Sequence, residues 1–115
     1  MLNLEKAEEF LSHAIANFSE ERASLAIVAG YLAMFNAARA VLFKDGWREK
    51  SHACVARYLE AKHKEIPQEF IDALDKFRER RQDVQYNPRF RPTEQDVSEF
   101  LQSAKEFIKL VKKLI

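Results

Sequence analysis

The sequence predicts an all-α fold, an up-and-down bundle of four to five helices. Its 115 residues include only two glycines and three prolines, the residues that most often interrupt helices. Ala, Leu, Glu, Lys and Arg are abundant, which is typical of long helices. A chain of this length can bury enough surface to fold without disulfides or metals, so we expect one helical domain over residues 1–115.

Two helices are expected in the first part of the chain. Apolar residues recur at helical spacing from Leu4 to Phe18, after a possible N-cap at Asn3, so the first helix should end near residue 19. The second should run from about residue 20 to residue 45, because Gly46 supplies the glycine that often follows a helix.

Three helices are expected in the second part. Ser51 is a suitable N-cap for a shorter helix over residues 52–63. Pro67 fits the first turn of a fourth helix that fades around Val84. The stretch "NPRFRP", residues 87–92, contains two prolines and should be a loop. Thr93 and an aspartate three residues later then resemble a capping box for the last helix.

The stretch from Ala23 to Phe43 has nearly the length of a membrane span. Many of its residues are alanines, which contribute little to insertion, and Arg39 lies well inside it. We therefore expect no membrane span and interpret the segment as the buried centre of the bundle. Arg39 must then pair with a carboxylate or line a cleft for a nucleotide or RNA.

Composition excludes several classes of function. Nineteen basic and eighteen acidic residues leave a net charge of +1, so no global field favours nucleic acid or lipid. The single Cys54 cannot form an internal disulfide, and the N-terminal residues do not resemble a signal peptide, so a cytoplasmic location is expected. The three histidines lack metal-ligand spacing and no glycine-rich phosphate loop is present, so we expect no metal and no cofactor.

One long segment carries a family resemblance. "YLAMFNAARAVLFKDGWREKSH", residues 31–52, resembles the central segment of small prokaryotic HEPN-domain proteins, in which a Tyr-x-Ala-Met-Phe-x-Ala-Ala-Arg-Ala run leads to Lys-Ser-His. The matching residues are Tyr31, Ala33, Met34, Phe35, Ala37, Ala38, Arg39, Ala40, Lys50, Ser51 and His52. "RQDVQY", residues 81–86, is similar to a second family motif, Arg-x-x-Ala-Asp-Tyr.

The resemblance implies a helical bundle that pairs as a homodimer and acts with a minimal nucleotidyltransferase partner in a toxin–antitoxin-like system. RNA-cleaving branches of the family use an arginine followed a few residues later by histidine. Here Arg81 is followed at positions 86 to 88 by Tyr86, Asn87 and Pro88, and no histidine occurs after it. Tyrosine is a poor proton shuttle at neutral pH, which argues against RNA cleavage.

A local basic segment supports a role with RNA or a nucleotide. Residues 76–91 contain six basic and two acidic residues, a local charge of +4, and Tyr86 offers a stacking surface among them. The alternative is an ordinary solvated helix end and loop. The candidate nucleotide- or RNA-binding residues are Arg39, Arg78, Arg81, Tyr86 and Arg89.

Two residues near the second loop allow two interpretations each. His52 lies at a helix start, where the dipole disfavours its protonation, and it either contacts a ligand or is partly exposed and inert. Trp47 is either a packing anchor over the end of the bundle or part of an interface.

Three functions therefore remain in competition. The first is a HEPN-like binding module, dimeric and without the usual ribonuclease histidine, that acts with the nucleotidyltransferase, RNA or a nucleotide. The second is an active RNase toxin that uses Arg81 and Tyr86. The third is a helical scaffold with no role in nucleic-acid binding, against which the basic segment argues.

Overall fold

Five α-helices account for most of the chain in a computed structural model that describes residues 2–115, with side chains from Asn3 onward. They are α1 (Leu2–Ser19), α2 (Ala23–Lys44), α3 (His52–Lys62), α4 (Gln68–Tyr86) and α5 (Glu94–Leu114). No strand occurs among the described residues. The prediction of an all-α bundle is confirmed.

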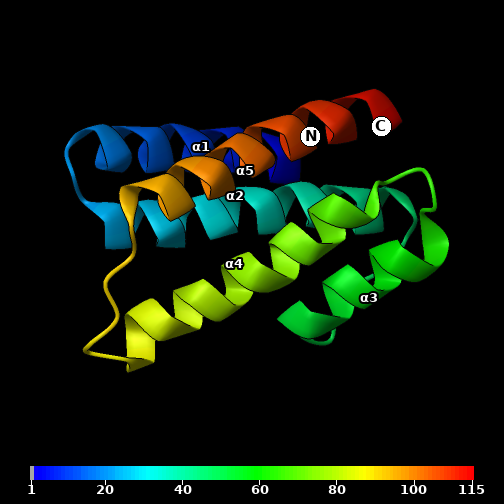
Figure 1. Cartoon of the computed structure of the whole chain (residues 1–115). Helices are drawn as coiled ribbons and strands as arrows, with labels where there is room; N and C mark the ends of the chain where they lie inside the picture. The colour runs from blue at the N-terminus through cyan, green and yellow to red at the C-terminus, as the bar shows by residue number, and fades with distance from the viewer. Residues whose placement is uncertain (1) are drawn as a thin grey trace.

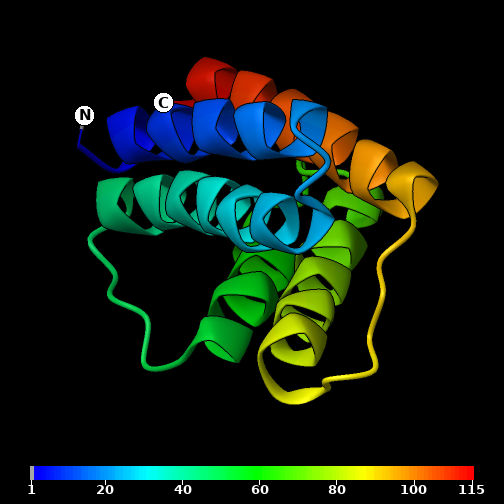
Figure 2. The same ribbon diagram turned by 90° about the vertical axis from the view of Figure 1, so that its left-hand side faces the viewer.

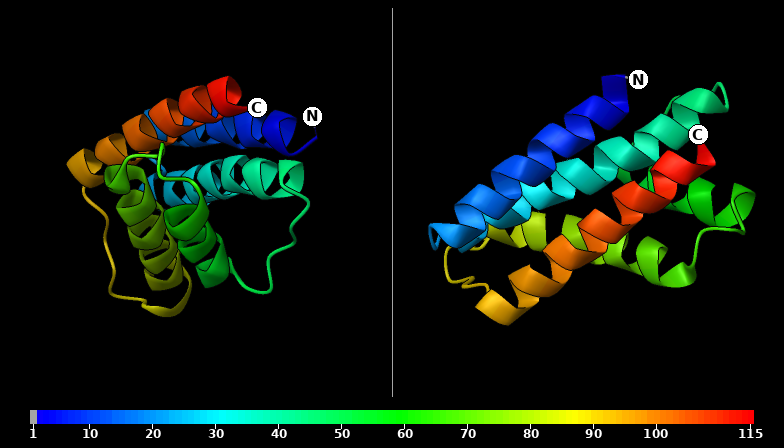
Figure 3. Two further views of the ribbon diagram at one scale, coloured as in Figure 1. Left: turned by 90° about the vertical axis from the view of Figure 1, so that its right-hand side faces the viewer. Right: turned by 90° about the horizontal axis from the view of Figure 1, so that it is seen from above.

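The helices form two groups, one of α1, α2 and α5 and one of α3 and α4, and α2 is the helix at which the two groups meet. Figure 1 and the views in Figure 3 show α1, α2 and α5 packed along one another. The hairpin of α3 and α4 crosses the opposite side of α2, and in Figure 2 it lies below the other three helices. Because α4 is longer than α3, the last turns of α4 extend past the start of α3 (Figure 1).

The core is built around α2, which contributes fourteen buried residues, more than any other helix. Among the described helices it alone is long and apolar enough to cross a membrane, and 78% of its apolar stretch is buried by the other helices. Gly30 permits a close approach here, because a Cβ atom at this position would lie 2.9 Å from both Leu101 Cδ2 and Phe77 Cζ. Packing within the bundle thus accounts for the apolar character of α2.

Local signals set most helix ends as expected. The Oγ atom of Ser51 accepts a hydrogen bond from the Cys54 amide at 3.3 Å, and that of Thr93 accepts one from the Asp96 amide at 3.1 Å. Gly46 has φ 82°, and residues 46 and 47 donate back to the carbonyls of residues 43 and 42. These last bonds form a Schellman motif, which fixes the course of the chain as it leaves α2.

Several expected boundaries are wrong by a few residues. Asn3 lies inside α1 and does not cap it, because the helix already begins at Leu2. The second helix begins at Ala23, since Glu21 has φ 62° and ends the first helix in a turn. Pro67 occupies the N-cap position, one residue before α4, and this helix continues to Tyr86.

Candidate functional site

Tyr31 forms the centre of a polar cluster where the α3–α4 hairpin meets α2. Its ring is fully buried, and its hydroxyl lies 2.7 Å from His52 Nδ1. Burial raises the pKa of Tyr31 to about 12, although Arg81 and Arg78 act in the opposite direction. The phenol therefore keeps its proton at neutral pH and serves as a hydrogen-bonding group.

His52 is the first residue of α3, and the Ser51 cap fixes its position. Its ring stacks on Phe35 with centroids 4.1 Å apart and an interplanar angle of 21°. Desolvation lowers the pKa of His52, and the nearby positive charge of Arg81 lowers it further. With Nδ1 held by Tyr31, the neutral imidazole retains Nε2 for another contact.

Arg81 on α4 approaches the same tyrosine from another side. Its guanidinium carbon lies 5.6 Å from the centroid of the Tyr31 ring, and the residue is half-buried. Within residues 3–115, no carboxylate or other hydrogen-bonding group pairs with this side chain. Arg81 is therefore a partly buried cation that has no ion pair among these residues.

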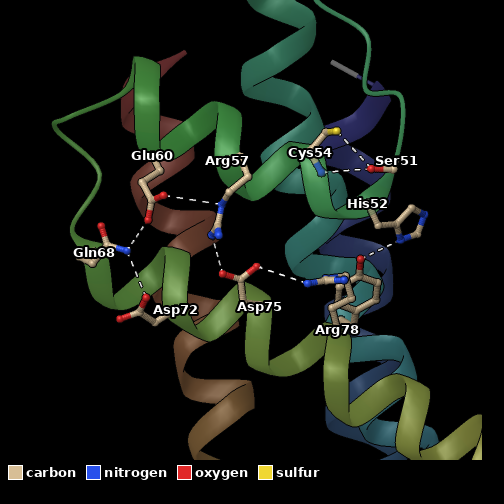
Figure 4. Close-up of polar contacts among 10 residues, drawn as sticks. Ser51, His52, Cys54, Arg57, Glu60, Gln68, Asp72, Asp75 and Arg78 are labelled. Atoms are coloured by element: carbon tan, nitrogen blue, oxygen red, sulfur yellow. Dashed lines mark hydrogen bonds and ion pairs between the residues drawn. The ribbon is translucent and has the colours of Figure 1, made fainter.

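Arg78, one turn before Arg81, belongs to a chain of charges that links α3 and α4. Asp75 Oδ2 accepts a hydrogen bond from Arg57 Nη2 at 2.6 Å, whereas Asp75 Oδ1 lies 3.7 Å from Arg78 Nη2. Figure 4 shows Asp75 between the two arginines, with His52 at the adjacent end of α3. Arg57 is thus held firmly, and Arg78 only loosely.

Arg39 has the ion pair that was one of its two expected roles. Its Nε lies 2.7 Å from Glu49 Oε1, and its guanidinium carbon is 5.7 Å from the centroid of the Phe35 ring. The side chain also lines a cavity of about 360 Å³ together with Trp47 and Arg48. Arg39 therefore has both a structural ion pair and a position beside a cavity.

Tyr86 and Arg89 lie at the far end of α4 and in the loop after it. Tyr86 is 76% exposed, and Arg89 is exposed as well. The Asn87 Oδ1 atom accepts a hydrogen bond from the Arg89 amide at 3.1 Å, which orders the loop. The structure therefore places these two residues on the basic end of α4, whereas Arg39 lies beside the loop between α2 and α3.

Sequence reasoning missed the central role of Tyr31 and left that of His52 open. The helical spacing of Tyr31, Phe35 and Arg39 already places them on one side of α2. Trp47 was expected to anchor the end of the bundle; it contacts the Tyr58 ring, with centroids 5.6 Å apart, but is 56% exposed. Among the described residues, no group of three or more His, Cys, Asp or Glu side chains is arranged to hold a metal.

A protein-family model matches this chain. The model of the HEPN domain family matches residues 2–114, nearly the whole chain. No curated protein matches. The family match agrees with the helical fold and indicates a nucleic-acid-related or RNase-like module.

Proposed function

We propose that this chain, which belongs to the HEPN domain family, binds the phosphate groups of RNA or of a nucleotide through Arg81 and the basic end of α4. The observation that carries the proposal is the unpaired guanidinium of Arg81, half-buried against Tyr31. A charge withdrawn from water normally has an ionic partner. Guanidinium presents planar donors that match phosphate oxygens, so a bound phosphate would complete this environment.

The surroundings of Arg81 support the same ligand. Arg78 lies one turn away and is only loosely held by Asp75. Exposed Tyr86 and Arg89 follow on the part of α4 and its loop that extends beyond α3. Cationic groups interspersed with an aromatic ring suit a single-stranded nucleic acid, whose backbone is anionic and whose bases can stack.

The proposal also includes partners. We propose that the protein is a homodimer that acts in the cytoplasm with a minimal nucleotidyltransferase, in a toxin–antitoxin-like system. These parts of the proposal rest on the resemblance of residues 31–52 and 81–86 to small prokaryotic HEPN proteins. A small nucleotidyltransferase encoded by a neighbouring gene would support the pairing.

A second candidate function, RNA cleavage, is favoured by the position of His52 beside Tyr31 and Arg81. In the neutral tautomer whose Nδ1–H donates to the Tyr31 oxygen, His52 Nε2 would take the proton of a ribose 2′-hydroxyl, whose oxygen would attack the adjacent phosphorus. The 5′-oxygen would leave with a proton from solvent, and the product would end in a 2′,3′-cyclic phosphate. This arrangement replaces the pairing of Arg81 with Tyr86, because Tyr86 lies at the exposed end of α4.

Incubation with RNA distinguishes binding from cleavage. If the protein only binds, purified chain without added metal leaves a labelled RNA intact. Cleavage that yields cyclic phosphate ends, and that is lost in a folded His52→Asn variant, would establish the second function.

Titration of a labelled single-stranded RNA across a salt series tests the binding proposal. The variant Arg81→Gln should bind at least about ten-fold more weakly, since hydrogen bonds to a charged group contribute roughly 1.5–3 kcal/mol. It should also lower the salt slope by about one, because one phosphate contact is lost. Lys109→Gln, on the exposed side of α5, is the charge-matched control and should leave both quantities unchanged. No binding at low salt, or equal affinities for all three folded proteins, would refute the proposal.

A further inference from the structure

A strip of aromatic and cationic side chains runs along α2. Tyr31, Phe35, Arg39 and Phe43 are four residues apart in succession, so they form a row that turns gradually about the helix, from the buried rings of Tyr31 and Phe35 to the exposed ring of Phe43. The rings of Tyr31 and Phe35 are 5.7 Å apart, and the Arg39 guanidinium carbon is 5.7 Å from the Phe35 centroid. With a rise of 1.5 Å per residue, the strip is roughly 18 Å long, which exceeds the length of a single nucleotide.

The two ends of the strip differ in chemistry. At one end Arg81 covers Tyr31, as described for the phosphate site. At the other end is the cavity of about 360 Å³, lined by Asn3, Arg39, Phe43, Trp47, Arg48 and Glu49. Its volume lies in the range of small-ligand sites, which are about 300–1,000 Å³. The row therefore leads from the phosphate site at its buried end to this cavity at its exposed end.

Trp47 is a fixed but accessible aromatic surface in this cavity. Its amide donates to the Leu42 carbonyl at 2.9 Å in the Schellman motif, and its ring contacts Tyr58. Even so, 56% of Trp47 and 65% of Phe43 are exposed. A base that stacked on Trp47 would remove apolar surface from water at little cost in side-chain order.

The charges around the cavity fit the rest of a nucleotide. Within residues 3–115, the Arg48 side chain has no carboxylate partner, so it is available to a phosphate. The Glu49 carboxylate is held by Arg39 Nε at 2.7 Å, which neutralises it and leaves oxygen acceptors for an amino group on a base. Cation, aromatic ring and hydrogen-bond acceptor therefore surround one cavity.

We propose that this cavity binds the base of one nucleotide in a single-stranded nucleic acid that also contacts Arg81. The base stacks on Trp47, and Arg48 contacts the adjoining phosphate. This inference rests on the proposed function, because the strand is the one whose phosphate Arg81 binds. It adds a second contact point, and hence a preference for an oligonucleotide over a mononucleotide.

The fluorescence of Trp47 reports on the cavity directly, since it is the only tryptophan in the chain. Short single-stranded RNA and DNA of the same sequence should both quench this fluorescence, and a mononucleotide should do so only at higher concentration.

Trp47→Ala should weaken oligonucleotide binding about 5- to 150-fold, the range for loss of one stacked base, without changing the salt slope. Arg48→Gln should lower the slope by about one. Leu25→Ala, which removes another exposed apolar side chain of α2, is the matched control and should bind like wild type.

The outcomes separate this inference from the proposed function. If Arg81→Gln weakens binding while Trp47→Ala does not and Trp47 is not quenched, the phosphate site is real and the cavity inference is wrong. If no variant binds differently from wild type, both are wrong. If Trp47 fluorescence changes with protein concentration in the absence of ligand, and Trp47→Ala sediments as a smaller species, the surface is a contact between copies and the inference is likewise overturned.

Discussion

Substitution of Gly30 by alanine tests how closely α4 must approach α2 for the site to form. The added Cβ atom would lie 2.9 Å from Leu101 Cδ2 and 2.9 Å from Phe77 Cζ. Non-bonded carbon atoms normally stay about 3.5–4.0 Å apart, so both neighbours must move. Phe77 is fully buried on α4 and lies one helical turn before Arg81. A shift of the α4 backbone that relieves the contact with Phe77 should therefore also displace Arg81 from Tyr31.

The expected loss of stability follows from two opposing effects. Overpacking of a core costs about 1–3 kcal/mol, whereas alanine is favoured over glycine within a helix by up to about 1 kcal/mol. We expect Gly30→Ala to lower the free energy of unfolding by about 1–2 kcal/mol. In a domain of 115 residues, the thermal midpoint should fall by roughly 4 °C for each kcal/mol, since the entropy of unfolding is about 2.1 cal/mol/K per residue.

Urea denaturation followed by circular dichroism measures this change, and RNA titration measures its effect on Arg81. Leu101→Ala provides a double-mutant cycle, because it removes one of the two atoms that the new Cβ meets. The double variant should be less destabilised than the sum of the two single variants. A Gly30→Ala protein as stable as wild type, with additive effects in the cycle, would show that the close packing at Gly30 does not set the position of α4.

Three further predictions concern pH, ligand contacts and assembly. His63 lies 2.6 Å from Asp45 Oδ2 and 2.7 Å from Glu65 Oε1, and although burial opposes protonation, these carboxylates raise its pKa overall. A raised folded-state pKa gives stability that is complete below the unfolded pKa of about 6.5 and is lost as pH rises through the folded value. The thermal midpoint of wild type should therefore fall more than that of His63→Gln between about pH 6 and pH 8, and equal slopes would contradict this. Tyr86→Ala should weaken RNA binding by about 1–3 kcal/mol at an unchanged salt slope, whereas Arg89→Ala should lower the slope; the reverse pattern would exclude stacking by Tyr86. Sedimentation should show a dimer at micromolar concentration, and a monomer there would refute the homodimer.

Local chemistry explains how much of the fold could be predicted. The helix ends are set by Ser51, Gly46 and Thr93 through hydrogen bonds and backbone turns that involve only residues close to them in sequence. Their effect can therefore be read directly from the sequence. The apolar run of α2 likewise indicates its place at the centre, whatever the order of its neighbours. The start of the second helix was less predictable, because nothing about Glu21 in the sequence indicates that it adopts a positive φ.

The candidate site was harder to predict, because its residues come from three separate helices. Tyr31, His52 and Arg81 are far apart in sequence, and their contacts depend on how α3 and α4 are positioned against α2. No histidine follows Arg81 in the sequence, yet the structure places His52, from an earlier helix, in the same cluster. Helical spacing alone could place Tyr31 beside Phe35, but it could not reveal which residues of other helices would meet them.

The contrast between Arg39 and Arg81 is what favours ligand binding over a purely structural bundle. Both lie against aromatic rings, and both might have been explained as core ion pairs. Arg39 has its carboxylate, so its charge needs nothing further. Arg81, only partly withdrawn from water, has the face of Tyr31 alone, and a cation–π contact contributes about 0.5–2 kcal/mol without the directed hydrogen bonds of an ion pair. An acidic partner on α2, α3 or α4 would remove this imbalance, and the described residues supply none for Arg81. A scaffold would gain only the cation–π contact from such an arrangement, whereas a phosphate-binding protein needs a cation that is positioned in advance and still unpaired.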